Sequence, residues 1–362
     1  MTATFNSTAG HCNLPGMQSL GKFPDRFIAE IAGQPDAIRR ARQAALDQAD
    51  ALASVRARGH IVFTGMGSSY DACYPAVTAL GSAGVAATML DAAELLHFRL
   101  PAVTADTLVV CVSQSGRSAE TVRVAEALAE RTPRPTLVAV TNGTSNPLAA
   151  LADVHLDTRA GEEHGPSTMT FVATLVLMDA VAGALGAESH DGAAAAADDA
   201  ERLLQDADVT AETLADWLDD RPVLTLLARG GARAAAEMGA LTLKEAARFP
   251  AESLQAAQFR HGPLELAGPE MAAMVFSTAA ATRALDLGMA DELRRAGAQV
   301  LMVGPDDATL PGAPAIVLGS LSDCLAPAVA VIPTQLLAWS LARRRGFDPG
   351  GYSLASKVTE RE

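Results

Sequence analysis

Short apolar runs alternate with helical patterns along most of this 362-residue chain, and this alternation restricts its possible folds more than any other feature. Strand-like runs recur at 60–65, 84–90, 107–113, 136–141 and 153–157. A long apolar helix is predicted next, at 168–186. Parallel strands need crossover connections, so strands that alternate with helices are typical of a parallel sheet covered on both faces. The first half is therefore predicted to be a doubly wound α/β unit.

The second half repeats this plan. Strands are predicted at 223–228, 272–277, 299–303 and 314–318, with helices at 232–248 and 324–345, and 191–199 is predicted to begin a connecting helix. The length suits two domains of ordinary size. We expect a flexible leader at 1–22, a first domain at 23–190, a second at 191–350 and a C-terminal tail at 351–362.

A loop rich in hydroxyl groups follows the third strand-like run and precedes a helical stretch that begins near Ala119. The N-terminus of a helix has unpaired N–H groups and a positive dipole end, which favour an anion. Gly116 would let the backbone approach a ligand closely. A capping role explains one serine such as Ser118 but not the whole set, so we favour phosphate binding. The predicted donors are Ser113, Gln114, Ser115 and Ser118.

A second loop of this kind, Gly65-Met66-Gly67-Ser68-Ser69, follows the first strand-like run. A single G-x-G after a strand is weak evidence, and here the third glycine of a dinucleotide fingerprint is missing. Two hydroxyl-rich loops suit one compact monophosphate better than a dinucleotide. The corresponding turns of the second half, at 229–231 and 276–279, have lost most of their hydroxyl groups, so the phosphate pocket is predicted in the first domain alone.

Composition excludes several classes of function. The formal net charge of −14 argues against non-specific binding to nucleic acid and against docking on an anionic membrane. No apolar segment is long enough to span a bilayer, and no secretory signal is evident. The four cysteines form no C-x-x-C pair, and the histidines do not cluster with them, so we expect no metal and no other cofactor. Cys73 and Cys111 are predicted to be buried, in a cytoplasmic protein.

Five motifs in order resemble the SIS (sugar isomerase) domain family. They are Gly-Met-Gly-Ser-Ser at 65–69, Ser-Gln-Ser-Gly at 113–116, Leu-Lys-Glu at 243–245, His-Gly-Pro-Leu at 261–264 and Leu-Ala-x-x-Val-Thr at 354–359. Taken singly, the last three have simpler explanations: a solvated helix glutamate, a loop histidine and a frayed tail. Together they resemble the isomerase half of glucosamine-6-phosphate synthase and the stand-alone SIS-type glucosamine-6-phosphate deaminases. The resemblance implies two tandem SIS domains.

The resemblance also implies roles for particular residues. A sugar 6-phosphate would be held by Ser68, Ser69, Ser113, Gln114, Ser115 and Ser118. Glu245 would correspond to the base that moves a proton between C1 and C2, a role that partial burial favours by raising the pKa of a carboxyl group. His261 would open the sugar ring from the neighbouring subunit, which implies a homodimer. Lys357 would form a Schiff base with the open-chain ketose or otherwise stabilise the open form.

The sequence departs from the synthase pattern at several positions. Compared with the synthase tail, Lys357 lies one position late when residues are counted back from Val358. It lies at the matching position when they are counted forward from Gly346. Thr242 and Met169 stand where the synthase has lysines. Residue 2 is Thr2 rather than the nucleophilic cysteine of a glutaminase domain, and the expected leader is too short for such a domain.

These departures favour a glucosamine-6-phosphate deaminase, which yields fructose 6-phosphate and ammonia, over a synthase. Two alternatives are enzymes on related substrates: another aldose–ketose phosphosugar isomerase, or a fructosamine-6-phosphate deglycase. The third is a phosphosugar sensor without enzymatic activity. A sensor would need only the phosphate loops, so the presence of Glu245, His261 and Lys357 argues against it.

Overall fold

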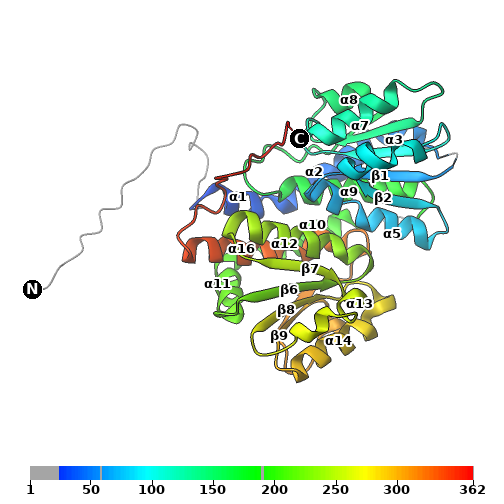
Figure 1. The fold of residues 1–362 in the computed structure, drawn as a ribbon. Coiled ribbons are helices and arrows are strands. Elements are labelled where there is room, and N and C mark those ends of the chain that lie inside the picture. The colour runs from blue at the N-terminus through cyan, green and yellow to red at the C-terminus, as the bar shows by residue number, and fades with distance from the viewer. Residues whose placement is uncertain (1–23, 58, 189–190, 362) are drawn as a thin grey trace, which may run out of the picture.

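The fold is given by a computed structural model that describes residues 24–57, 59–188 and 191–361. The described chain forms two lobes, each built on one parallel sheet of five strands (Figure 1). The first sheet has the order β2-β1-β3-β4-β5 and the second the order β10-β9-β8-β6-β7. The expected leader at 1–22 lies outside the described residues, as does Cys12. No helix of the described part is long and apolar enough to cross a membrane.

The strands lie close to the runs that the sequence predicts. Those of the first lobe are β1 (Ile61–Gly65), β2 (Ala87–Asp91), β3 (Leu108–Val112), β4 (Thr136–Thr141) and β5 (Val154–Asp157). Those of the second lobe are β6 (Val223–Ala228), β7 (Ala251–Gln255), β8 (Met271–Phe276), β9 (Gln299–Pro305) and β10 (Ala315–Leu318). Strand β7 was not predicted from the sequence. Its polar residues Glu252, Ser253 and Gln255 interrupt any apolar run, which an edge strand tolerates because one side has no neighbour.

The second sheet repeats the topology of the first. In the first lobe β1 pairs with both β2 and β3, so Ile61 lies opposite Ala87 on one side and Leu108 on the other. In the second lobe β6 pairs in the same way with β7 and β8. In each lobe the chain therefore reverses its winding direction beside the first strand, where α/β proteins bind ligands at the carboxyl ends of the strands. The predicted tandem α/β fold is confirmed.

Three helices precede the first strand: α1 (Arg26–Ala32), α2 (Gln34–Asp47) and α3 (Ala49–Ser54). Asp25 caps α1 by accepting a hydrogen bond from the Ile28 N–H at 3.0 Å. Pro35 lies in the first turn of α2, where a missing N–H costs little. The other first-lobe helices are α4 (Ser68–Asp71), α5 (Tyr74–Ser82), α6 (Ala92–Glu94), η1 (Leu95–Arg99), η2 (Leu100–Ala102), α7 (Ala119–Ala129), α8 (Pro147–Leu151) and α9 (Met169–Ala184).

The connecting helix α10 (Ala193–Leu203) packs against α2, where Arg39 pairs with Asp198 and Glu201 at 2.9 and 2.5 Å. The helix expected at 324–345 divides into α15 (Ala326–Ala330) and α16 (Ile332–Arg344). The remaining elements are α11 (Ala207–Leu218), η3 (Gly230–Ala232), α12 (Arg233–Ala247), α13 (Ala256–Phe259), η4 (Pro263–Leu266), η5 (Ala280–Thr282), α14 (Arg283–Arg295) and η6 (Asp306–Ala308).

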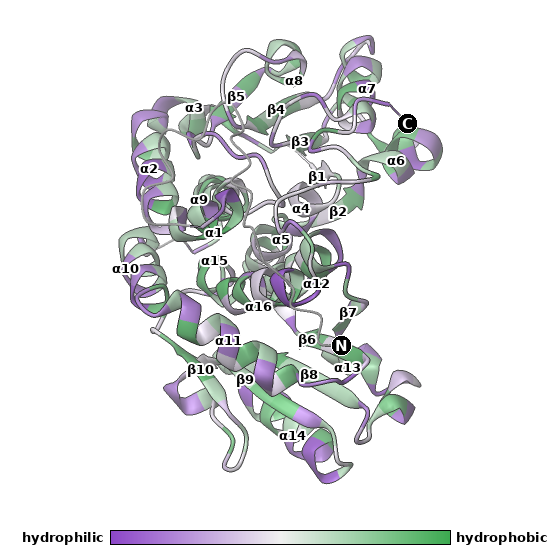
Figure 2. Ribbon diagram, turned by 90° about the vertical axis from the view of Figure 1, so that its left-hand side faces the viewer, coloured by the Kyte–Doolittle hydropathy of each residue, from purple (hydrophilic) through white to green (hydrophobic). Residues whose placement is uncertain are grey.

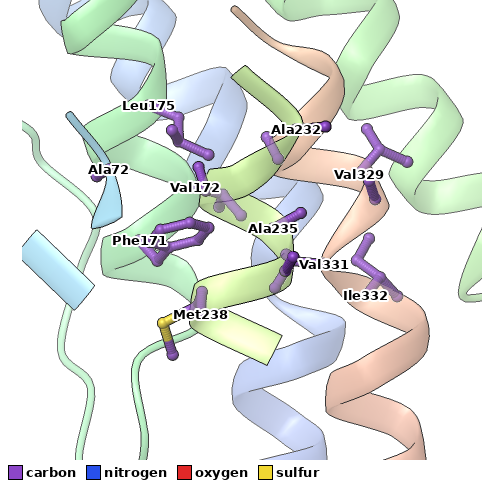
Figure 3. Close-up of a cluster of buried hydrophobic side chains, with 14 of the residues drawn as sticks. Ala72, Phe171, Val172, Leu175, Ala232, Ala235, Met238, Val329, Val331 and Ile332 are labelled. Atoms are coloured by element: carbon purple, nitrogen blue, oxygen red, sulfur yellow. The ribbon is translucent and has the colours of Figure 1, made fainter. Parts of the chain in front are cut away.

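One hydrophobic core joins the two lobes. Figure 2 shows α5, α9, α12, α15 and α16 lying between the two sheets. Helix α9 is apolar on nearly every face, as expected of a helix surrounded by protein. Phe171 and Leu175 of α9, Met238 of α12 and Ile332 of α16 belong to the same buried cluster (Figure 3). The continuous core fixes the second lobe against the first, so α12 is held at a defined position relative to the loops after β1 and β3.

The predicted burial of two cysteines is confirmed. Cys73 and Cys111 are fully enclosed, and burial raises the pKa of the Cys111 thiol to about 12. Cys73, Cys111 and Cys324 are all reduced in the described residues. These thiols are packed as small apolar groups.

Candidate active site

A cavity of about 310 Å³ opens at the carboxyl ends of β1 and β3, at the reversal point of the first sheet. Its wall combines the two hydroxyl-rich loops, the last turns of α12 from the second lobe, and the C-terminal tail. The lining residues are Met66, Gly67, Ser68, Ser69, Gln114, Ser115, Ser118, Glu120, Ser167, Leu241, Glu245, Tyr352, Ala355, Ser356, Lys357 and Thr359.

The loop after β3 has a conformation that requires glycine. Gly116 has φ +62°, and a Cβ built on it would lie 2.0 Å from the Asn146 side chain. Asn146 is held in place because its Oδ1 accepts from the Ala149 N–H at 2.9 Å, at the start of α8. The Leu148 N–H donates to the Gly116 carbonyl at 3.2 Å. The loop is thereby packed against α8, and its serines are presented at the N-terminus of α7.

The two loops touch each other across the cavity wall. The Gln114 N–H donates to Ser69 Oγ at 3.3 Å, and the hydroxyl groups of Ser68 and Ser167 lie 3.0 Å apart. Five of the predicted phosphate ligands therefore line one cavity: Ser68, Ser69, Gln114, Ser115 and Ser118. Ser113 is buried behind them, with its Oγ 3.1 Å from Ser118 Oγ. The hydroxyl groups and the positive end of the α7 dipole suit an anion at this end of the cavity.

Glu245 lines the cavity from the second lobe, near the C-terminal end of α12. Burial raises the pKa of its carboxyl group to about 7, and the nearby Glu163 adds to this effect. The Lys357 ammonium opposes it by favouring the ionised form. A carboxyl group with a pKa near neutrality can accept a proton and return it, as general acid–base catalysis requires.

The tail crosses from α16 to the first lobe and ends beside α7 (Figure 1). The Ala119 N–H, at the start of α7, donates to the Thr359 carbonyl at 3.0 Å. Lys357 reaches into the cavity, and its Nζ donates to Glu163 Oε2 at 2.6 Å and to the Gly165 carbonyl at 2.7 Å. Glu245 and Lys357, 112 positions apart in the sequence, therefore line the same cavity.

Sequence reasoning missed the acidic groups around Lys357. Glu163 lies in the loop before α9 with a fully buried side chain, and Glu30 of α1 accepts from the His164 N–H at 2.7 Å. Burial raises the pKa of Glu30. Tyr352 of the tail and Glu120 of α7 also line the cavity. A sequence signal existed for Glu163: a glutamate in a loop, five and seven residues before two threonines that begin a helix.

Three further positions discussed above lie elsewhere or have other partners. His261 is exposed between α13 and η4 and does not line the cavity of its own chain. Thr242 is buried, and its hydroxyl donates to the Met238 carbonyl of its own helix at 2.8 Å. Met169 begins α9. Among residues 24–57, 59–188 and 191–361, no three His, Cys, Asp or Glu side chains are grouped so that they could hold a metal ion.

Comparison with known proteins places this geometry in a family. The chain is 31% identical to a glutamine–fructose-6-phosphate aminotransferase (isomerizing) of Pyrobaculum aerophilum, over 95% of this chain and 59% of that protein. The chain therefore spans about three fifths of the length of this curated relative.

Solved structures have the same fold. The C-terminal domain of glucosamine-fructose-6-phosphate aminotransferase from Francisella tularensis superposes with a TM-score of 0.79 at 23% identity, covering 92% of this chain and 99% of that one. A glucosamine-6-phosphate deaminase from Thermotoga maritima superposes with a TM-score of 0.72 at 17% identity, covering 92% and 99%. A model of the SIS domain matches residues 54–184 and 218–308. The chain belongs to the SIS domain family.

Proposed function

We propose that this protein is a phosphosugar isomerase that moves a proton between C1 and C2 of a sugar 6-phosphate. One observation carries the proposal: two loops with five hydroxyl or amide side chains between them, and a carboxyl group with a pKa of about 7, line a single cavity. The relative from Pyrobaculum aerophilum, whose name includes an isomerizing activity on a fructose 6-phosphate, supports the same chemistry.

In the proposed reaction the phosphate binds at the N-terminus of α7, and the chain of the open sugar extends toward Glu245. The Glu245 carboxylate removes a proton from the carbon next to the carbonyl group, and the electron pair moves onto the carbonyl oxygen. The resulting enediolate takes the same proton back at the neighbouring carbon while the hydroxyl proton passes from one of the two oxygens to the other, which exchanges aldose and ketose. Lys357 supplies positive charge in the same cavity, where negative charge develops on oxygen.

The finer proposal is that the substrate is glucosamine 6-phosphate. Two carboxyl groups, Glu120 and Glu245, line the cavity beside one ammonium, Lys357, and a third carboxyl group, Glu163, lies directly behind it. This excess of acidic groups favours a sugar that carries an amino group. Proton transfer from C2 to C1 would give an imine at C2, and water would replace its nitrogen. The products are fructose 6-phosphate and ammonia.

A homodimer with a shared site belongs to the same proposal. His261 is exposed on the second lobe and is therefore available to reach the cavity of a second copy. In this arrangement it would open the sugar ring before Glu245 acts on the open chain.

Incubation with glucosamine 6-phosphate, followed by assays of both ammonia and fructose 6-phosphate, tests the function. We expect the two products in equal amounts, and a loss of both in Glu245→Gln but not in Glu252→Gln, which changes an exposed strand residue. If the protein releases no ammonia but interconverts fructose 6-phosphate with its aldose isomer, the isomerase proposal stands and the deaminase proposal is contradicted. Binding without turnover of amino sugar, fructosamine or simple sugar phosphates would contradict the enzyme and support a sensor.

A further inference from the structure

Lys357 is one of only three lysines in the chain, the others being Lys22 and Lys244. Its Nζ makes two hydrogen bonds, to Glu163 Oε2 at 2.6 Å and to the Gly165 carbonyl at 2.7 Å. An ammonium group has three N–H donors, so one remains for a group in the cavity. The lysine is thus fixed at its tip, although it lies in a tail that has no regular secondary structure.

Glu163 is fixed as firmly as the lysine it holds. Its Oε1 accepts from the Thr168 N–H at 2.8 Å, the Thr168 hydroxyl at 3.1 Å and the Thr170 N–H at 3.0 Å, and its Oε2 accepts from the Thr170 hydroxyl at 2.5 Å. The side chain is fully buried, whereas that of Lys357 is 20% exposed. Oε2 therefore faces Lys357 in a fixed direction, and the N-terminus of α9 holds it there.

Several acidic groups lie around Lys357. Glu163 precedes α9, Glu30 lies on α1, Glu245 lies on α12, and Tyr352 lies on the tail itself. Glu120 of α7 also lines the cavity. Lys244, also on α12, is exposed and lowers the pKa of Glu245. The Glu163 carboxylate makes a charge-assisted hydrogen bond with an ammonium group at this position, whereas a Schiff base requires a free amine as nucleophile.

We propose that Glu163 is a positioning residue that holds Lys357 as an ammonium ion, so that Lys357 stabilises the enediolate by its charge and forms no Schiff base. This inference rests on the isomerase function proposed above. When Glu245 removes the carbon-bound proton, the electron pair moves to the carbonyl oxygen, and the third N–H of Lys357 donates to that oxygen. No bond to Lys357 forms or breaks, and its proton stays on nitrogen throughout.

Glu163→Gln tests the positioning role, because the amide keeps an oxygen acceptor for the threonines but loses the charge. The neighbouring Glu162→Gln is the matched control, since that side chain is 85% exposed. We expect kcat to fall about 100-fold with KM within about threefold in Glu163→Gln. Glu163→Asp, which keeps the carboxylate, should recover part of kcat. Unchanged kcat in Glu163→Gln would overturn the proposal.

A double variant shows whether Glu163 acts through Lys357. If it does, Glu163→Gln combined with Lys357→Met should be no slower than Lys357→Met alone. If the fold-reductions in kcat of the two single variants multiply in the double variant, Glu163 acts through the stability of the fold instead. The variants that carry Glu163→Gln would then also have lower melting temperatures.

Chemical trapping separates the ammonium role from a Schiff base. Borohydride added during turnover should leave Lys357 unmodified, and with three lysines in the chain the peptide assignment is unambiguous. A sugar adduct on Lys357 in the wild-type protein would overturn the proposal.

One further measurement remains decisive if no phosphosugar is turned over, which would defeat the proposed function itself. Acetylation of Lys357 at pH 8.5 should be about tenfold slower than that of Lys244, and it should accelerate in Glu163→Gln but not in Glu162→Gln. Equal acetylation rates of Lys357 in all three proteins would show that Glu163 does not hold the ammonium.

Discussion

Arg229 Nε donates to Asp286 Oδ1 at 2.8 Å, and this buried ion pair lies in the second lobe at the position where the first lobe has its serine loops. Arg229 follows β6, the counterpart of β1, and Asp286 lies in the first turn of α14, which follows β8 as α7 follows β3. The hydroxyl groups of Ser277 and Thr282 also donate to Asp286, at 3.3 and 3.1 Å. A carboxylate of the chain itself thus occupies the N-terminus of this helix, where a phosphate would otherwise be favoured.

Asp286→Ala should destabilise the protein by about 3 kcal/mol, because it leaves the buried Arg229 without a partner. The double variant Arg229→Met/Asp286→Leu should recover most of this loss, since it removes both charges and fills the space. Chemical denaturation measures both. Asp291→Ala, which changes a partly exposed carboxylate on the same helix, is the control and should cost less than about 1 kcal/mol. If Asp286→Ala leaves the free energy of unfolding unchanged, the ion pair does not stabilise the second lobe.

Ser115→Ala and Ser118→Ala should each raise KM for a sugar 6-phosphate about tenfold, with kcat within a few-fold, because each removes one donor from a bound anion. Ser113 is buried and contacts Ser118, so Ser113→Ala should act by displacing Ser118 and raise KM as well. Ser54→Ala at the exposed end of α3 serves as the control. A fall in kcat with unchanged KM would contradict the assignment of this loop to the phosphate.

The rate of turnover should depend on the ionisation of Glu245. Only the carboxylate can accept a proton from carbon, and burial raises its pKa to about 7, so kcat should rise as the pH passes through 7 and level off above it. The substrate phosphate titrates near pH 6 and would affect KM, which separates the two effects. Glu245→Gln should lower kcat by about 1,000-fold with KM little changed. A flat kcat profile between pH 6 and 8 would count against Glu245 as the base.

Glu245 should also cost stability at the pH where it works. Its pKa of about 7 in the folded protein lies above the value of 4.5 for a free glutamate, so the folded state keeps a proton that the unfolded state loses. The stabilising contribution is complete below pH 4.5 and is lost as the pH rises through 7. Glu245→Gln should therefore match the wild type at pH 4.5 and exceed its free energy of unfolding by about 2 kcal/mol at pH 8. An equal difference at both pH values would contradict this.

Apart from β7, the sequence predicted the strands of both sheets and the two serine loops, because these depend on local patterns. An apolar run such as Leu108–Val112 is typical of a buried parallel strand, and the turn after it presents its hydroxyl groups at the carboxyl edge. β7 was missed because Glu252 and Gln255 give it no apolar pattern. The pairing of Glu163 with Lys357 could not be predicted, because the two residues are 194 positions apart and only the folded tail brings them together.

His261 and Glu245 allow a direct test of the shared site. If each cavity takes Glu245 from one subunit and His261 from the other, a mixed dimer of His261→Ala and Glu245→Gln chains has one intact site and one site with both changes. Random pairing of equal amounts, after co-expression, should then restore about a quarter of wild-type activity from two inactive proteins. His261 is exposed in the single chain, so its replacement should leave the melting temperature unchanged. No recovery in a verified heterodimer would mean that His261 serves no neighbouring cavity.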